Sequence, residues 1–266
     1  MAAHPLAEAA ATRTIRGTRI EIIERGAGAP LLFLHPAIGI APTAPVLAHL
    51  ARGFRVIAPT HPGFGISEQP PTFDSIDDLA YFYLDLLDEL ALTDVVLAGV
   101  SFGGWIAAEI AVKSCARLSH LVLANPVGIK ISDRETRDIA DVFALTEDQV
   151  AALAYFDPAA GALDYKAMPE AEVRAVARNR EALARYGWSP YLHDPKLNAR
   201  LHRISVPTLL LWGTADQILS EPYGRAYAAA IPNGRFAPIE RAGHFPHIEQ
   251  PEAFAQLIRA FVQGAA

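Results

Sequence analysis

Cysteine is nearly absent from this chain of 266 residues, which contains a single one, Cys115. One cysteine cannot form an intrachain disulfide, and no pairing of cysteine with histidine has the spacing of a zinc site. We therefore expect no structural metal. A reducing, cytoplasmic location is the default prediction.

Long apolar runs are also missing. No run reaches the roughly 18 residues that a membrane-spanning helix needs. The first residues, 1–14, lack the apolar stretch that follows a basic start in a signal peptide. The sequence thus predicts a soluble protein with no membrane span and no secretory leader.

Basic charge is not concentrated anywhere along the chain. Lys and Arg number 23 and Asp and Glu number 29, which gives a formal net charge of −6. No candidate helix carries the basic cluster with which nucleic-acid-binding proteins neutralise phosphates. We therefore expect no nucleic-acid partner.

Hydrophobic residues, in contrast, make up 52% of the chain, which predicts a large buried core. Short apolar strand patterns alternate with longer helical ones, and this order predicts a doubly wound, mostly parallel α/β sheet. The strand patterns lie at residues 15–24 (a strand or hairpin), 31–35, 55–58, 95–100, 120–125, 208–212 and 235–239. The helical patterns lie at residues 77–91, 102–115 and 251–262, and an Ala-rich leader at residues 7–11 is expected to be frayed.

One long segment breaks this alternation. Residues 127–203 contain helical patterns at 133–143, 146–156 and 169–186 without an intervening strand. Insertions of this length usually cover a site. We therefore predict a core domain made of residues 1–126 and 204–266, with residues 127–203 as a helical cap.

The most informative motif is Gly99-Val100-Ser101-Phe102-Gly103, which follows an apolar strand and precedes a helical pattern. The strand before it and the helix after it exclude most chance matches to Gly-x-Ser-x-Gly. A sharp strand-to-helix turn strains the serine backbone, and side chains at the two glycine positions would collide with neighbouring elements. This turn, a nucleophile elbow, predicts that Ser101 is a nucleophile.

With this motif the sequence resembles the α/β-hydrolase family over residues 15–263. Three further features agree. The strand at 31–35 ends in a histidine-containing turn, residues 61–67 are similar to the Gly-x-Gly-x-Ser loop of the family, and the segments 211–216 and 243–246 look like its acid and histidine loops. The chain order Ser, Asp, His is that of the family.

The resemblance implies a catalytic triad of Ser101, Asp216 and His244. A serine hydroxyl is a poor nucleophile at neutral pH, so His244 would take its proton during attack on a carbonyl. Asp216 would fix the imidazole tautomer and stabilise the imidazolium.

Other residues compete for these roles. His247 is a rival base, and Asp94 and Glu240 are rival acids, but only Asp216 follows a strand end in the right order. Some family members place the acid where this chain has Asn125, and an asparagine carries no charge.

An oxyanion hole needs fixed donors for the negative charge that develops on the carbonyl oxygen. The backbone N–H of Phe102, at a helix N-terminus, is one expected donor. By resemblance, the second is the N–H of Ala37, two positions after His35. The sequence departs from the family here because Pro36, with a fixed φ and no N–H, replaces the usual glycine.

Aromatic residues of the predicted cap and of the triad loops are expected to line an apolar substrate pocket. The candidates are Trp105, Phe143, Tyr155, Trp188 and Phe245.

These features predict a serine hydrolase that cleaves a carboxylic ester or lactone of a small apolar substrate, without a metal or organic cofactor. One alternative is a carbon–carbon hydrolase of ring-cleavage diketo acids, against which Val100 and Phe245 count, since that group commonly has asparagine and tryptophan there. Another is a small-ligand receptor of the same fold that does not turn over. The sequence predicts no oligomeric state.

Overall fold

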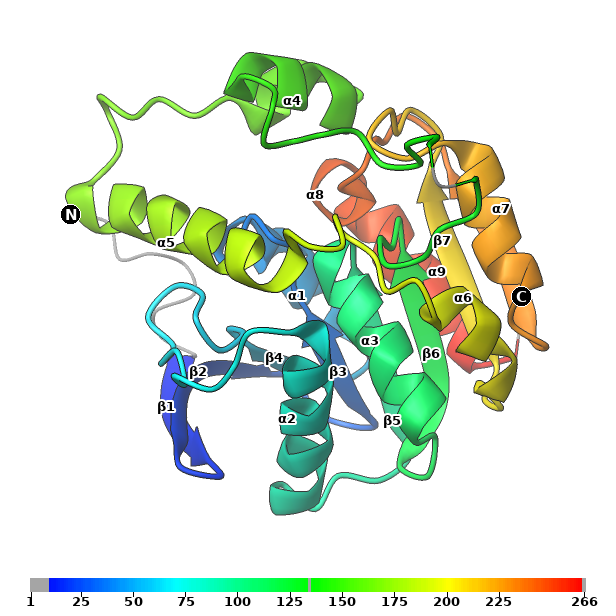
Figure 1. Ribbon diagram of the computed structural model, residues 1–266. Helices are drawn as coiled ribbons and strands as arrows, with labels where there is room; N and C mark the ends of the chain where they lie inside the picture. The colour runs from blue at the N-terminus through cyan, green and yellow to red at the C-terminus, as the bar shows by residue number, and fades with distance from the viewer. Residues whose placement is uncertain (1–9, 134, 265–266) are drawn as a thin grey trace.

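A central sheet of eight strands organises the molecule (Figure 1). The computed structural model describes residues 10–133 and 135–264. The strand order is β1-β2-β4-β3-β5-β6-β7-β8; β1 and β2 form an antiparallel hairpin at one edge, and the pairs from β4 to β8 are parallel. The strands are β1 Ala10–Ile15, β2 Thr18–Arg25, β3 Pro30–Leu34, β4 Arg55–Pro59, β5 Val95–Val100, β6 Leu118–Ala124, β7 Thr208–Gly213 and β8 Gly234–Ile239. The predicted doubly wound α/β sheet is confirmed.

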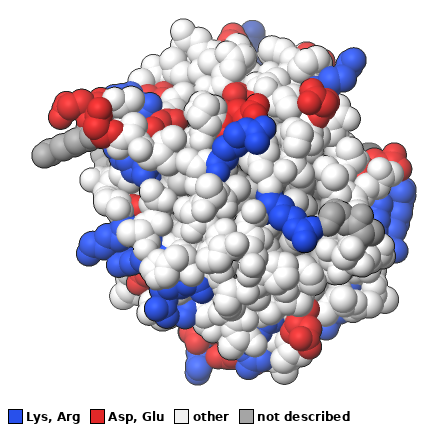
Figure 2. Space-filling model, turned by 90° about the vertical axis from the view of Figure 1, so that its right-hand side faces the viewer, with Lys and Arg blue, Asp and Glu red and all other residues white. Residues whose placement is uncertain are grey.

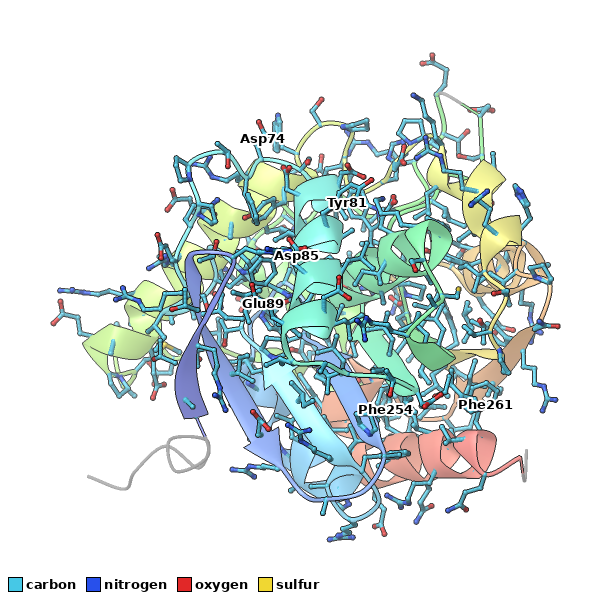
Figure 3. The ribbon with its side chains drawn as sticks, turned by 90° about the horizontal axis from the view of Figure 1, so that it is seen from below. Asp74, Tyr81, Asp85, Glu89, Phe254 and Phe261 are labelled. Carbon is cyan, nitrogen blue, oxygen red and sulfur yellow. The ribbon has the colours of Figure 1, made fainter. Side chains whose placement is uncertain are left out.

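Helices cover both faces of this sheet. Helices α2 and α3 lie on one face and α9 on the other, so that three layers are visible from below (Figure 3). The α-helices are α1 Ala44–Leu50, α2 Ile76–Glu89, α3 Phe102–Lys113, α4 Glu147–Ala154, α5 Glu170–Gly187, α6 Leu197–Arg200, α7 Glu221–Ala229, α8 Pro246–Glu249 and α9 Pro251–Val262. Short 3-10 turns occupy η1 Ala41–Thr43, η2 Pro158–Gly161 and η3 Leu201–Arg203.

Apolar periodicity explains how these helices pack. In α9, Phe254 and Phe261 are one heptad apart, and both are buried. In α2, Tyr81, Asp85 and Glu89 share the outward face (Figure 3). Both helices therefore follow the amphipathic pattern of a helix laid on a sheet.

The first strand differs from the expectation for the Ala-rich leader. Ala10 and Ala11 belong to β1 and pair with Ile23 and Ile22 of β2. The expectation of fraying is wrong for these two residues, because the hairpin partner binds their backbone groups. Residues 7–9 lie outside the described part of the chain.

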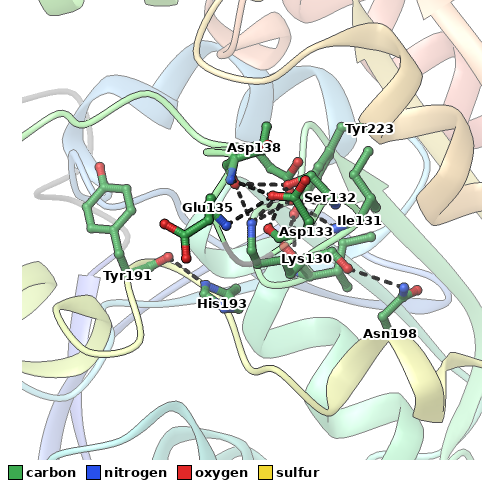
Figure 4. Close-up of polar contacts among 12 residues, drawn as sticks. Lys130, Ile131, Ser132, Asp133, Glu135, Asp138, Tyr191, His193, Asn198 and Tyr223 are labelled. Atoms are coloured by element: carbon green, nitrogen blue, oxygen red, sulfur yellow. Dashed lines mark hydrogen bonds and ion pairs between the residues drawn. The ribbon is translucent and has the colours of Figure 1, made fainter.

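The helix predicted at 133–143 is also wrong, because the described residues of that range, 133 and 135–143, form an irregular loop (Figure 4). The carboxylate of Asp138 accepts hydrogen bonds from the N–H groups of Ile131 (2.9 Å) and Ser132 (3.2 Å). The carboxylate of Asp133 accepts from the N–H groups two and three residues after it, at 3.0 and 2.8 Å. Asp138 is thus bound to N–H groups six and seven residues before it, which folds this segment back on itself, whereas helical hydrogen bonds join residues four apart. Helices α4 and α5 match the other two predicted segments, and the division into core and cap stays a prediction.

The surface carries both signs of charge. On the face shown in Figure 2, Lys and Arg side chains are interspersed with Asp and Glu among uncharged residues. Of the helices in residues 10–133 and 135–264, none has the length and apolar character that crossing a membrane demands.

Candidate active site

Ser101 occupies the sharp turn between β5 and α3. Its backbone lies in an unfavourable region, with φ 52° and ψ −113°. A Cβ atom at Gly99 would lie 2.2 Å from the carbonyl oxygen of Gly103, and one at Gly103 would lie 2.2 Å from that of Leu34. Both neighbours are backbone atoms, so only glycine allows the turn to pack here.

The structure brings three of the predicted residues into one hydrogen-bonded chain. Ser101 Oγ lies 2.7 Å from His244 Nε2, and His244 Nδ1 lies 2.8 Å from Asp216 Oδ2. All three side chains are buried. Because an ionised carboxylate only accepts, Nδ1 carries the proton of the neutral ring and Nε2 is left to accept from the serine hydroxyl.

The carboxylate of Asp216 is held on both oxygens. Its Oδ1 accepts from the N–H groups of Ile218 (2.8 Å) and Leu219 (3.1 Å) in the loop after β7. Its Oδ2 accepts from Asn125 Nδ2 at 2.7 Å in addition to His244. The sequence analysis considered Asn125 only as a residue that cannot replace the acid. Its position directly after a strand pattern was the signal that could have predicted a contact with the loop of Asp216.

The two expected oxyanion donors lie on neighbouring strand ends. Phe102 is the first residue of α3, and Ala37 follows β3, which pairs with β5. Within the described part of the chain, neither N–H donates to an acceptor. Neither group is therefore committed to a hydrogen bond within the described residues.

The orientation of the Ala37 N–H is fixed through its own peptide group. The carbonyl of Pro36 belongs to the same peptide, and it accepts from His35 Nδ1 (2.7 Å) and from Gly39 N–H (3.0 Å). In a trans peptide the N–H points away from the carbonyl. The two donors on the carbonyl side thus hold the Ala37 N–H in one direction despite the proline.

His35 and His61 support this turn as neutral rings. The N–H of His61 donates to His35 Nε2 at 3.0 Å, and His61 Nε2 donates to the carbonyl of His35 at 2.8 Å. The hydroxyl of Tyr83 donates to the remaining nitrogen, His61 Nδ1. Burial lowers the pKa of His35 to about 4 and that of His61 well below its ordinary value.

The competing residues lie elsewhere. His247 is buried against Phe33, Phe245 and Phe254, and within the described residues neither ring nitrogen has a hydrogen-bond partner. Burial, with the neighbouring His244 as a second cause, lowers the pKa of His247 to about 3.

The two rival acids are also outside the hydrogen-bonded chain. Glu240 accepts from the Thr214 hydroxyl, and Asp94 is exposed.

A family model described as the alpha/beta hydrolase family matches residues 31–257 of this chain. The chain belongs to the alpha/beta hydrolase family. Membership supports hydrolase activity, and the relatives differ in the reaction that their names describe.

Two curated relatives match this hydrolase over nearly its full length. The 2-hydroxymuconate semialdehyde hydrolase of Pseudomonas sp. (strain CF600) is 28% identical, over 94% of this chain and 92% of its own. A putative non-heme haloperoxidase of Mycobacterium phage D29 is 30% identical, over 91% of this chain and 90% of its own.

Among solved structures, the malate-bound thermophilic esterase of Thermogutta terrifontis is similar to this hydrolase. Its TM-score is 0.73 and its identity 26%, over 96% of this chain and 98% of its own.

The predicted pocket residues of this hydrolase fall into two groups. The ring of Phe245 lies 4.9 Å from that of His244 and 5.3 Å from that of Tyr155. Trp105 lies 6.5 Å from Phe102, edge to face. Phe245 therefore packs on the ring of His244 with Tyr155 beyond it, and Trp105 packs on the residue after Ser101.

Phe143 and Trp188 form the second group. Their rings lie 5.3 Å apart, and Phe143 also contacts Tyr191. Trp188 is 62% exposed and borders a cavity of about 470 Å³ whose lining includes Lys130, Asp138 and His193 but none of Ser101, Asp216 and His244. Within residues 10–133 and 135–264, no group of three or more His, Cys, Asp or Glu side chains is placed to hold a metal ion.

Proposed function

We propose that this protein is a serine hydrolase that cleaves a carboxylic ester or lactone of a small, largely apolar substrate through an acyl-enzyme. The observation that carries the proposal is the chain from Ser101 Oγ to His244 Nε2 (2.7 Å) and from His244 Nδ1 to Asp216 (2.8 Å). This is the arrangement that serine nucleophiles require.

In the first half-reaction, Ser101 Oγ attacks the carbonyl carbon while its proton passes to His244 Nε2. The negative charge that forms on the carbonyl oxygen is stabilised by the N–H groups of Phe102 and Ala37. The tetrahedral intermediate collapses, the bond to the alcohol oxygen breaks, and His244 returns the proton to that oxygen. The alcohol leaves, or in a lactone stays attached through the acyl chain.

In the second half-reaction, His244 takes a proton from water and the resulting nucleophile attacks the acyl carbon. The bond to Ser101 Oγ breaks, and the proton returns to the serine. The products are the carboxylic acid and the regenerated enzyme. No metal or organic cofactor takes part in these steps.

The proposed cap, residues 127–203, supports an enclosed site. The backbone N–H of His244 donates to the carbonyl of Ala154 at the end of α4 (2.6 Å), and Gln217 N–H donates to that of Leu153 (2.9 Å). With the Tyr155 ring against that of Phe245, this end of the cap places apolar surface beside the histidine, which favours apolar substrates. Phe143 and Trp188 would serve substrates that extend toward the outer cavity.

Carbon–carbon bond hydrolysis is the second candidate, and the 28% identical 2-hydroxymuconate semialdehyde hydrolase favours it. The same triad could cleave a diketo acid after attack on its ketone carbonyl. Val100 before the serine and Phe245 after the histidine count against this candidate.

Steady-state hydrolysis of p-nitrophenyl esters of graded acyl length, by the native protein and by Ser101→Ala, tests the proposal. We expect many turnovers by the native protein and a loss of at least about 10³-fold in the variant, because removing a triad nucleophile disables the acyl-enzyme route. A 2-hydroxy-6-oxo-dienoate, followed by its ultraviolet absorbance, is assayed in parallel.

The outcomes separate the candidate functions. A higher kcat/KM for the dienoate than for every p-nitrophenyl ester would assign carbon–carbon hydrolysis instead. Ester turnover that persists in Ser101→Ala would contradict the nucleophile. A native protein that turns over none of these substrates but binds apolar ligands would be a receptor.

A further inference from the structure

Helix α5 reaches the turn that carries the second oxyanion donor through one buried side chain. Asn179 is only 7% exposed. Its Nδ2 donates to the carbonyl of Ile38 at 3.1 Å, and its Oδ1 accepts from the N–H of Gly65 at 2.9 Å. The amide therefore joins two loops that lie far from it in the sequence.

The turn is shaped to admit this amide. Gly39 has φ +96°, and a Cβ atom there would lie 2.3 Å from Asn179 Nδ2. A side chain at position 39 would thus both strain the backbone and displace the amide. Glycine at this position and asparagine on α5 form one matched contact.

Two other side chains of α5 bind the loop at residues 62–67 and not the turn at residues 36–39. Arg178 donates to the carbonyls of Gly63 (3.1 Å) and Ser67 (2.6 Å), and the hydroxyl of Tyr186 donates to that of Pro62 (3.2 Å). Of these three side chains, only that of Asn179 also bonds to the turn at residues 36–39. The position of α5 on the core is therefore secured without Asn179, whereas its bond to Ile38 is specific to the turn.

The bond to Ile38 acts on the far end of the turn. The core fixes the Pro36–Ala37 peptide through His35, but the Ile38–Gly39 peptide precedes a glycine and can rotate at low steric cost. Rotation of that peptide would redirect the Gly39 N–H, which closes the turn on the Pro36 carbonyl at 3.0 Å. The Pro36–Ala37 peptide, which carries the Ala37 N–H, would then lose one of the two hydrogen bonds to its carbonyl oxygen.

We propose that Asn179 is a positioning residue that holds the Ala37 N–H in place as the second oxyanion donor, so that the cap helix α5 completes the oxyanion hole. The inference rests on the proposed function, because it assumes that a carbonyl oxygen becomes negatively charged beside Phe102 and Ala37. It deepens that function by assigning part of the transition-state stabilisation to a cap residue.

Asn179→Asp is the decisive variant because it is isosteric. It keeps an acceptor for the Gly65 N–H but places a carboxylate oxygen against the Ile38 carbonyl in place of the donor. We expect kcat for p-nitrophenyl esters to fall by about 10- to 100-fold with KM changed by less than about twofold, as for weakening an interaction made in the transition state. Arg174→Ala, on an exposed part of the same helix, is the matched control and should keep native kcat.

A comparison of an ester with its thionoester separates positioning from general damage. Sulfur is a weaker hydrogen-bond acceptor than oxygen, so a correctly placed oxyanion hole favours the ester. We expect the ester-to-thionoester ratio of kcat/KM to fall in Asn179→Asp and in Asn179→Ala, and to stay native in Arg174→Ala. The ratio does not depend on the fraction of folded protein, so partial unfolding cannot imitate the result.

Two outcomes would overturn the inference: an unchanged ester-to-thionoester ratio in both Asn179 variants, or native kcat in Asn179→Asp. The control for the underlying function is Ser101→Ala. If that variant retained ester turnover, the proposed function itself would fail, whereas loss of turnover there with native behaviour of the Asn179 variants would reject the role of Asn179 alone.

Discussion

At the scale of single residues, Asn125 shows how a neutral side chain can support a charged one. Its Oδ1 accepts from the N–H of Gly213 at 3.0 Å, which leaves Nδ2 to donate to Asp216 Oδ2. The residue is fully buried and has φ 41°, a conformation that asparagine tolerates better than most residues. The Gly213 backbone, the Asn125 amide and the Asp216 carboxylate are thus joined by hydrogen bonds, and Asp216 in turn contacts His244.

Replacing Asn125 tests this arrangement. Asn125→Ala removes a hydrogen bond to a charged acceptor, a loss of about 1.5–3 kcal/mol, and we expect kcat for p-nitrophenyl esters to fall roughly tenfold or more. In Asn125→Asp, two carboxyl groups share the site, so the pKa of one is raised. While the pair holds a proton it can still donate to Asp216. Activity should therefore survive at low pH and decline as the pH rises through the raised pKa.

The test is to measure kcat from pH 5 to 9 for the native protein and for both variants. An Asn125→Asp profile that superimposes on the native one would show that the amide proton of Asn125 has no part in holding Asp216.

At the scale of elements, capping residues and apolar periodicity predicted a helix correctly where its apolar face also packs on the sheet. Helix α2 begins at a capping box, in which the Ser75 hydroxyl accepts from the N–H of Asp78 and the Asp78 carboxylate accepts from that of Ser75. The described residues of the range predicted as a helix at 133–143 show the opposite case, because Asp138 accepts from N–H groups six and seven residues before it and so folds the segment back as a loop. The helical pattern there gave no sign of these contacts.

Ser75→Ala should lower the free energy of unfolding by about 1 kcal/mol, because an orphan N–H of α2 loses its acceptor. Ser75→Gly is the matched control, and it should cost only a few tenths of a kcal/mol. Urea denaturation of the three proteins gives the values. Equal stability of the native protein and Ser75→Ala would mean that the cap contributes nothing to α2.

At the scale of the whole molecule, buried histidines make stability depend on pH. Burial lowers the pKa of His35 to about 4 and that of His247 to about 3. The unfolded chain binds these protons below about pH 6.5, whereas the folded chain does not. Each histidine therefore contributes stability that is fully present above pH 6.5 and is lost as the pH falls toward its folded-state pKa.

His247→Leu tests this dependence. Between pH 6 and 4.5 we expect the free energy of unfolding of the native protein to fall by about 1.4 kcal/mol per pH unit for each such histidine. The variant should show a shallower slope, since one of these groups is gone and no hydrogen bond is lost with it. Urea unfolding at several pH values measures both slopes, and identical slopes would contradict the assignment of His247 as a buried neutral group.

The sequence by itself determined the alternation of strands and helices, the glycines of the elbow and the order of Ser101, Asp216 and His244 along the chain. These are local properties, because periodicity and turn sterics act within a few residues. Tertiary structure alone decided which side chains meet. Asn179 lies 141 residues from Ile38, and Asn125 lies 91 residues from Asp216. Contacts over such separations depend on how the sheet and α5 pack together, and no local pattern encodes that packing.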